Sequence, residues 1–239
     1  MKDEVLFGAR KETLNHFKHL YEGPWIKKYS QENKTKELRE RMYTNEFKRV
    51  KNYFDLKIGG NVLDIGCGTG DFLELFGDNW NKYGIEISEK LKKILREKRI
   101  ITNFEFKENF FDIIIFRGTI QHIPDPISKI EKCYYWLKKG GGIVFLATPN
   151  TNSLVYKLFN DLPMLAEEFN FLLPSDKMLK QILTNFRFRN IKFYYPYGET
   201  PYAKPFRDKL SLIYWYLFRR REKPTFAFPK NVMECYARK

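Results

Sequence analysis

The chain has 239 residues, of which 43% are hydrophobic and 17% aromatic, and it shows no low-complexity block or repeat. This composition is typical of a folded globular chain and excludes a disordered one. The formal net charge of +14 would attract anions such as phosphorylated substrates, nucleic acid or acidic lipid, although lysines spread over a solvated surface give the same count.

Residues 10–55 show helical periodicity, so we expect two or three helices there and assign residues 1–55 to an N-terminal helical cap. One apolar face carries Leu38, Met42, Phe47, Val50 and Phe54. The first residues place charges around only three apolar side chains, which is not the pattern of a secretory signal. His16 and His19 lie one helical turn apart and could form half a metal site or face a substrate. No carboxylate cluster completes a metal site, so surface positions are favoured.

Residues 56–239 alternate between strand and helix patterns, which predicts one α/β domain: a Rossmann-like, doubly wound sheet with helices on both faces. We expect its first five strands at residues 62–65, 82–87, 101–106, 111–116 and 143–148. Helices are expected at residues 71–76, 88–97 and 126–138. Ser88 is the predicted N-cap of the second helix, and three glycines are the predicted stop of the third.

The pattern loosens after residue 150, and we expect insertions in the core at about 150–174 and 196–229. A helix should start at Ser175 or Asp176, and strands are expected at residues 188–195 and 231–237. The second insertion is too long for a hairpin turn, so it should be functional or a lid. Its run from Phe206 to Arg221 is apolar with a basic end and could lie on an anionic membrane. A lid or dimer helix buried against the pocket is favoured, because the run has no clean polar face.

No apolar run reaches the roughly 20 residues that span a bilayer. The three cysteines, Cys67, Cys133 and Cys235, are odd in number and form no C-x-x-C pair, so we expect neither a disulfide framework nor a zinc site. These features predict a protein of the reducing cytoplasm.

Residues 61–70, N-V-L-D-I-G-C-G-T-G, lead an apolar strand into Gly66, Gly68 and Gly70. Side chains there would block the approach of a ligand to the backbone, and a helix start would direct free N–H groups at that ligand. The nicotinamide and flavin fingerprint places its third glycine three positions after the second, whereas here the distance is two. Glu86 ends the second strand, and its carboxylate can accept hydrogen bonds from both ribose hydroxyls. The pattern predicts a nucleotide-like cofactor site.

V-L-D-I-G-C-G-T-G followed by Y-G-I-E-I-S resembles the class I S-adenosylmethionine-dependent methyltransferases. Three further segments resemble the family's later strands and loops: F-D-I-I-I-F-R-G-T-I-Q-H-I-P-D-P at 111–126, L-K-K-G-G-G-I-V-F-L-A-T-P-N at 137–150 and F-P-K-N-V-M-E-C-Y-A-R-K at 228–239. The resemblance covers about residues 45–150 and weakens after them. It implies a seven-stranded sheet, parallel except for an antiparallel final strand, and S-adenosylmethionine as the cofactor.

The resemblance also implies roles for individual residues. Gly66, Gly68 and Gly70 would line the methionine part of the cofactor, and Asp64 would organise their loop. Glu86 would hold the ribose, and Ile87 would pack on the adenine. The remaining expected members of the cofactor site are Cys67, as a small buried residue and not a nucleophile, Asn103 near the adenine amino group, and Arg117 and Gly118 near the methionine end or the substrate. The family's usual Gly-Asp is missing near Asn103.

A sulfonium methyl carbon is electrophilic enough that the protein supplies mainly in-line geometry, with a base only where the acceptor must lose a proton. His122 is the candidate base, because it follows the central strand where ligands collect in open α/β sheets. The alternative is that it packs the loop, since the family commonly places an acid beside this histidine and this chain has Gln121. Asp125, between two prolines, is expected in a turn.

The segment after the fourth strand lacks the Asn or Asp followed by Pro-Pro and an aromatic residue that the family uses to methylate nucleic-acid bases, so a nucleic-acid substrate is disfavoured. The R-G-T-I-Q-H-I loop most resembles enzymes of bacterial polysaccharide and lipopolysaccharide biosynthesis, which implies a hydroxyl of a sugar or glycan-linked small acceptor. Two alternatives stay open. The acceptor could be a phosphorylated metabolite, an amine or a quinone precursor, or the chain could be a catalytically silent partner that binds the cofactor. A homodimer is also open.

Overall fold

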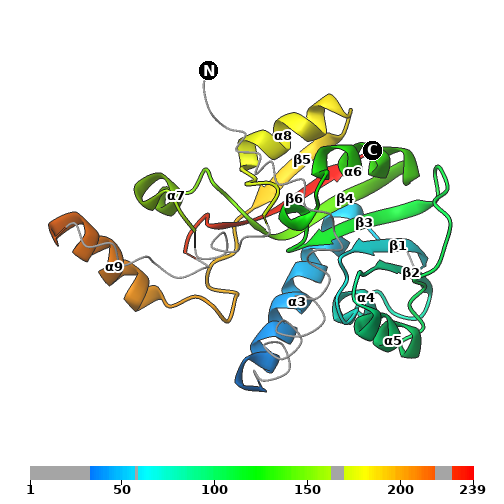
Figure 1. Cartoon of the computed structure of the whole chain (residues 1–239), viewed down its shortest axis with the longest axis horizontal. Coiled ribbons are helices and arrows are strands. Elements are labelled where there is room, and N and C mark those ends of the chain that lie inside the picture. Colours follow the sequence, from blue (N-terminus) through cyan, green and yellow to red (C-terminus); the bar gives the residue numbers. More distant parts are fainter. Residues whose placement is uncertain (1–32, 57–58, 163–169, 219–227) are drawn as a thin grey trace.

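The computed structural model describes residues 33–56, 59–162, 170–218 and 228–239. A six-stranded sheet in the order β2-β1-β3-β4-β6-β5 crosses the molecule (Figure 1). Its strands are β1 Gly60–Ile65, β2 Trp80–Ile85, β3 Phe111–Arg117, β4 Leu137–Pro149, β5 Arg189–Tyr194 and β6 Val232–Arg238. Strands β1 to β4 are parallel to one another, and β6 runs antiparallel to both β4 and β5.

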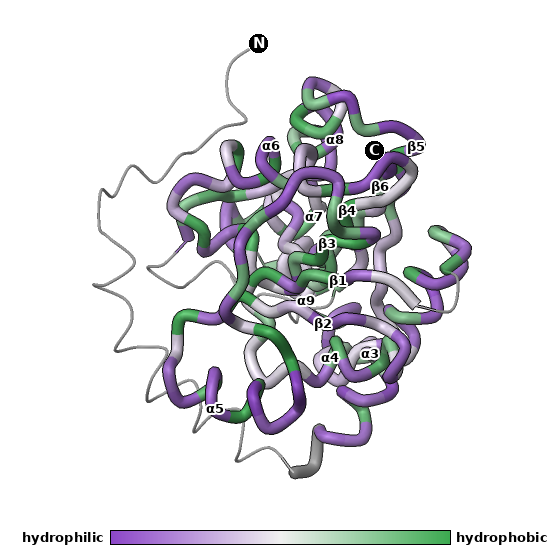
Figure 2. Tube along the Cα trace, turned by 90° about the vertical axis from the view of Figure 1, so that its right-hand side faces the viewer, coloured by the Kyte–Doolittle hydropathy of each residue, from purple (hydrophilic) through white to green (hydrophobic). Residues whose placement is uncertain are grey.

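The helices cover both faces of this sheet. They are α3 Asn33–Phe54, α4 Asp71–Glu74, α5 Glu89–Glu97, α6 Pro126–Trp136, α7 Leu154–Phe159, α8 Asp176–Asn185, α9 Pro205–Phe218 and a short 3-10 helix, Ile120–His122. Because alternate residues of a strand face opposite sides, β3 supplies both cores. Ile113 and Ile115 pack with α3, α4 and α5, whereas Ile114 and Phe116 pack with α6 and α8. Figure 2 shows β3 as a hydrophobic strand in the middle of the molecule.

Several sequence predictions are confirmed. The Ser88 hydroxyl accepts a hydrogen bond from the Leu91 N–H at the start of α5, and the Ser175 hydroxyl accepts one from the Met178 N–H at the start of α8. The Asp125 carboxylate accepts one from the Ser128 N–H, which fits the expected turn. Among the described helices, none is long and apolar enough to cross a bilayer. Residues 1–32, with His16 and His19 and most of the expected cap, lie outside the described residues.

The prediction of seven strands is wrong, because residues 101–106 do not form one. Within the described part of the chain, they contribute only the isolated bridge between Tyr83 and Ile101. Beyond it the aromatic side chains find other partners: the Phe104 ring lies edge-on to Tyr83, and the Phe106 ring stacks on Trp136 at a centroid distance of 3.9 Å. The chain bends away from β2 and the ladder stops.

The predicted helix over 126–138 ends two residues early, and its glycines are not a helix stop. Leu137 is already extended, and residues 138–142 belong to β4. The glycines allow close packing: a Cβ atom at Gly142 would lie 1.9 Å from the Phe54 ring of α3, and one at Gly141 would lie 2.7 Å from the Asp112 carbonyl oxygen. Helix α3 therefore docks closely on the strand where a side chain would prevent it.

The described part of Phe206–Arg221 is not buried against the glycine loop, so the expected lid is wrong there, whereas a dimer helix stays a prediction. Helix α9 packs beside α7 and away from the glycine loop, with Leu212 against Val155 and the Trp215 ring near Phe159 (Figure 1). Its opposite side is exposed.

Candidate active site

The glycine loop joins β1 to α4 at the carboxyl end of the central strands. Gly66, Gly68 and Gly70 have φ angles of 80°, 56° and 77°, a left-handed region that favours glycine. The N–H groups of Gly66 and Cys67 donate to the Ile85 carbonyl, at 2.8 and 3.2 Å, and so tie the loop to β2.

The three glycines are needed for different reasons. A Cβ atom at Gly66 would lie 2.3 Å from the Thr119 methyl group, and one at Gly70 would lie 2.4 Å from the Ile100 side chain, so both positions need glycine for close packing. A Cβ atom at Gly68 would meet nothing within 4 Å. Gly68 therefore lies at the open side of the loop, where a ligand can approach the backbone.

Glu86 faces this loop from the end of β2. Its Oε2 accepts a hydrogen bond from the Gly68 N–H at 3.0 Å, and its Oε1 accepts from the N–H groups of Ile87 and Ser88 at 2.8 and 2.9 Å. Burial raises the pKa of Glu86, and these hydrogen bonds oppose the shift. Since a carboxylate has about four acceptor positions, Oε2 retains one for a hydroxyl group.

Asp64 provides a second carboxylate at the end of β1. It is 2% exposed, and its Oδ1 has no hydrogen-bond partner within the described structure. Burial raises the pKa of Asp64 to about 7, while the nearby Arg117 opposes the shift and Glu86 adds to it. An unsatisfied buried acceptor is costly, so this oxygen fits a ligand that brings an N–H group to it. The orphaned acceptor and the open face at Gly68 are what the methionine end of S-adenosylmethionine needs.

The other expected cofactor residues differ in how they are placed. Cys67 packs so closely on β2 that a Cβ atom at Gly84 would lie 2.6 Å from its sulfur, and burial raises its pKa well above the ordinary value, which fits an inert thiol. Ile87 is half-buried beside Glu86 and outside the described hydrophobic clusters. Asn103 is exposed at the bend that replaces the third strand, and its contact with adenine stays a prediction.

Arg117 ends β3 and binds α3. Its Nε donates to Glu46 at 2.8 Å, and its guanidinium lies 3.9 Å from the centre of the Tyr43 ring. Glu46 is 2% exposed. The neighbouring Gly118 has a φ angle of 63°, and its N–H donates to the Leu146 carbonyl. Arg117 thus joins α3 to the strand end beside Asp64.

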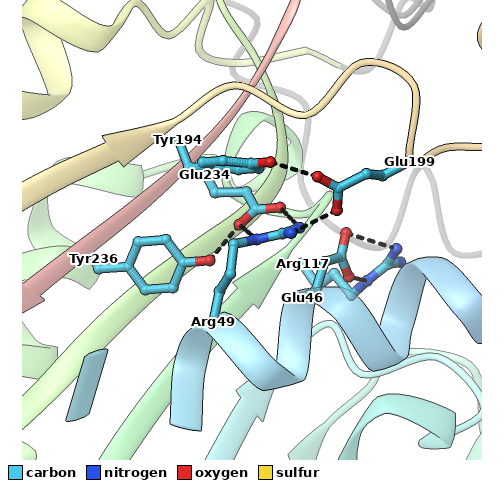
Figure 3. Close-up of polar contacts among 7 residues, drawn as sticks. All are labelled: Glu46, Arg49, Arg117, Tyr194, Glu199, Glu234 and Tyr236. Atoms are coloured by element: carbon cyan, nitrogen blue, oxygen red, sulfur yellow. Dashed lines mark hydrogen bonds and ion pairs between the residues drawn. The ribbon is translucent and has the colours of Figure 1, made fainter. Parts of the chain in front are cut away.

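A larger polar network lies next to this pair and was not predicted from the sequence (Figure 3). Arg49 donates to Glu234 through Nε and Nη2, at 2.8 and 2.6 Å, and to Glu199 through Nη1 at 2.6 Å. Tyr236 donates to Glu234, and Tyr194 donates to Glu199. Burial raises the pKa of Glu234, and Arg49 opposes the shift. The one sequence signal was a glutamate inside an otherwise apolar strand, V-M-E-C-Y, since a buried charge needs a partner.

A pocket adjoins this network between α3 and residues 198–200. It is lined by Leu38, Arg41, Asn45, Gly198, Glu199 and Thr200. Four of these lining residues carry polar side chains: Arg41, Asn45, Glu199 and Thr200.

His122 is half-buried in the 3-10 helix that follows Gly118 and Thr119. Its Nε2 lies 3.2 Å from the Gln121 side-chain nitrogen, which also donates to the Gly118 carbonyl. Because an amide nitrogen only donates, this assignment makes His122 Nε2 the acceptor and places the proton of the neutral ring on Nδ1. Gln121 therefore orients the ring, and the use of His122 as a base stays a prediction.

Comparisons with known proteins identify the family and the fold of the chain. Residues 32–192 match a family described as Methyltransferase domain. Phosphoethanolamine N-methyltransferase 3 of Arabidopsis thaliana is 31% identical over 129 residues, which cover 47% of this chain and 26% of that protein. A ubiquinone biosynthesis O-methyltransferase of Nitrosomonas europaea is 32% identical over 123 residues, covering 44% of this chain and 52% of that protein. The chain thus matches about a quarter to a half of the length of these two relatives.

The fold matches that of a solved SAM-dependent methyltransferase from Thermotoga maritima, with a TM-score of 0.61 and 18% identity, over 93% of this chain and 99% of that one.

Proposed function

The chain belongs to the methyltransferase domain family, and we propose that it transfers a methyl group from S-adenosylmethionine to a small acceptor, with a phosphorylated amine as the leading candidate. This acceptor replaces the sugar hydroxyl that the sequence favoured. The pocket between α3 and residues 198–200 carries the choice, because its wall offers Arg41 and Asn45 to a phosphate and the Glu199 carboxylate to an ammonium group. The phosphoethanolamine N-methyltransferase relatives also support it.

The donor would bind at the glycine loop. Bound S-adenosylmethionine supplies an electrophilic methyl carbon on a positively charged sulfur. Asp64 Oδ1 would accept an N–H of its ammonium group, Glu86 Oε2 would accept a ribose hydroxyl, and Gly68 would let the backbone approach. The two carboxylates favour the cationic donor over its product, which has lost the sulfonium charge.

The acceptor would be oriented by residues that are themselves held in place. Glu199 is fixed by Arg49 and Tyr194, so its carboxylate direction is set before a ligand arrives. An ammonium group must lose a proton before its nitrogen can attack. His122 is the candidate base, and it would take that proton on Nε2 after the Gln121 amide has released this nitrogen. Orientation of the two reacting atoms supplies the larger part of the rate enhancement, roughly 7–11 kcal/mol in well-ordered cases.

A hydroxyl acceptor is the second candidate. The position of His122 directly after the Gly118 turn favours it, because a phenol or sugar hydroxyl needs a base, and the relative from ubiquinone biosynthesis supports it. A quinone precursor and a sugar would both be attacked through oxygen, and the same histidine would serve either.

The test is a panel of acceptors with the purified chain and S-adenosylmethionine, followed by S-adenosylhomocysteine release and product mass. We expect phosphoethanolamine to be methylated and ethanolamine to react poorly, because ethanolamine cannot use Arg41. Turnover of only a catechol or a nucleotide sugar would contradict the amine proposal and favour the hydroxyl candidate.

Calorimetry with S-adenosylhomocysteine separates the remaining outcomes. Binding without turnover of any acceptor would favour a silent cofactor-binding partner. Absence of binding would contradict every methyltransferase proposal for this chain.

A further inference from the structure

Helix α9 has two unlike faces. Its inner face is fixed to the molecule: Asp208 and Ser211 are buried, Leu212 packs on the cluster of Val155, Leu162 and Phe228, and Asp208 accepts a hydrogen bond from the Tyr197 hydroxyl at 2.9 Å. The face is therefore held by both polar and apolar contacts, and the helix is not free to turn its other side inward.

The outer face is apolar, and no segment within the described ranges packs on it. Phe206, Ile213 and Leu217 follow one another at i, i+7 and i+11, which places them on one side of the helix, and they are 78%, 51% and 60% exposed. Aromatic residues flank this stripe: Tyr214, Tyr216 and Phe218 are all exposed. The helix lies at the edge of the molecule, away from the sheet (Figure 1). This large apolar patch marks a contact surface.

The charges around the stripe are almost all positive. Arg207 and Lys209 are exposed on the helix, while its one acid, Asp208, is turned to the inner face. In the sequence the helix is followed directly by Arg219, Arg220 and Arg221. An apolar stripe with aromatic and cationic flanks is the composition of helices that lie in the plane of an anionic membrane surface.

We propose that the outer face of α9 docks on a bilayer with anionic head groups. Phe206, Ile213 and Leu217 enter the boundary between head groups and acyl chains, the tyrosines lie at head-group level, and the cations contact the anionic lipids. A second copy of the chain is a poorer occupant, because an α9–α9 contact would bring two helices together whose exposed charges, at Arg207 and Lys209, are both positive. Docking here leaves the glycine loop on a different part of the fold.

The test is flotation of the full chain with two kinds of vesicle, phosphatidylcholine alone and phosphatidylcholine with phosphatidylglycerol. We expect binding to the anionic vesicles only, and release by salt. The triple variant Phe206→Ser/Ile213→Ser/Leu217→Ser should lower the bound fraction by about tenfold or more. Arg207→Gln/Lys209→Gln should lower it by about fivefold per cation removed.

Tyr135→Ser on α6 is the matched control, because Tyr135 is 53% exposed and far from α9 in the sequence; it should bind like the wild type. All variants should keep the circular dichroism spectrum and the affinity for S-adenosylhomocysteine. Three outcomes would overturn the proposal: no flotation of the wild type, equal binding to neutral vesicles, or a triple variant that still binds. A dimer in sedimentation velocity that the triple variant abolishes, without vesicle binding, would instead identify a second copy as the occupant.

Discussion

The proposed donor side, at the glycine loop, and the proposed acceptor side, at the Arg49 network and its pocket, are built in different ways. Around the glycine loop, the key contacts involve the backbone: left-handed glycines, and the N–H groups that hold Glu86 within 18 residues of sequence. On the acceptor side, side chains meet across the fold, as Arg49 does with Glu234, 185 residues away. A site built from backbone groups can be recognised in a short sequence motif. A network of side chains forms only when the folded sheet brings distant segments together.

The two sides also differ in whether their buried carboxylates are paired with a cation of the protein. The Asp64 carboxylate is buried, and its Oδ1 has no hydrogen-bond partner among the described residues, so it can accept a hydrogen bond from a ligand. The Glu46 and Glu234 carboxylates are buried with arginines already bound to them. The buried carboxylates Glu46 and Glu234 are thus paired with arginines, which should make this side the more important one for stability.

The largest expected effect is a loss of folding stability when the Arg49 network on the acceptor side loses its buried carboxylate. Glu234→Ala leaves Arg49 without its main partner in a buried setting and should lower the free energy of unfolding by about 3 kcal/mol, measured by urea denaturation. Glu74→Ala is the control, since Glu74 pairs with Lys98 at 2.7 Å on the surface and should cost less than about 1 kcal/mol. Equal losses in the two variants would contradict a stabilising role for the network.

The second-largest effect distinguishes the roles of Gly68 and Gly70 on the donor side by the stability that each alanine variant loses. Gly70→Ala should cost about 2 kcal/mol, because its methyl group would press on Ile100 and Leu95 and φ is positive. Gly68→Ala meets no such contact and should cost only about 1 kcal/mol for its left-handed backbone. Calorimetry with S-adenosylhomocysteine should rank the two variants in the opposite order. Relative to the stability that each variant loses, Gly68→Ala should lose more affinity for S-adenosylhomocysteine than Gly70→Ala. A larger stability loss at Gly68 would show that its open face is misassigned.

The third effect is a pH dependence of Asp64. Its raised pKa, about 7, means that the folded state holds a proton which the unfolded state has released. The unliganded protein should therefore lose stability as the pH rises from about 4 to about 7. Affinity for the cationic donor should increase with pH and level off above about pH 7, with a slope that approaches about tenfold per pH unit below the pKa, because only the carboxylate attracts an ammonium group. Asp64→Asn should flatten both profiles; an unchanged affinity profile in this variant would remove Asp64 from the donor site.

The smallest expected effect is a change in KM that tests whether Glu199 binds the acceptor. Glu199→Gln keeps the shape of the pocket wall and removes its charge, so it should raise the KM for a phosphorylated amine several-fold, on the order of 1 kcal/mol, with little change in kcat. Asp78→Asn, an exposed surface acid, is the control. A fall in kcat at constant KM would mean that Glu199 does not bind the ground-state acceptor.

Sequence patterns predicted the parts of the fold that depend on neighbouring residues. The β1 glycine loop, the position of Glu86 beside it and the Ser88 cap follow from local spacing and are present. The strand predicted at residues 101–106 is absent because the Phe104 ring lies edge-on to Tyr83 and the Phe106 ring stacks on Trp136. Strand propensity does not take such contacts into account. The helix stop predicted at the three glycines failed because the close approach of Phe54 to Gly142 comes from a distant helix, which local spacing does not show.

The Arg49 network and the exposure of α9 were missed for the same reason. Glu46 and Arg49 lie on the polar side of an amphipathic helix, and only the positions of β3 and β6 show that Glu46 is bound by Arg117 and Arg49 by Glu234. The apolar residues of α9 suggested burial, since hydrophobicity alone does not show whether a partner face exists in the fold.

The placement of β6 between β4 and β5 sets an order for assembly. In this sheet β5 hydrogen-bonds only to β6, although β6 is made later and the whole α9 segment lies between them. During synthesis β1 to β4 can therefore pair as soon as they emerge, whereas β5 is an unpaired strand until residues 232–238 have left the ribosome. The same strand carries Glu234, so the docking of α3 through Arg49 is completed by the event that closes the sheet. Pulse-labelled hydrogen exchange should find β5 and α3 gaining protection together, after β1 and β3.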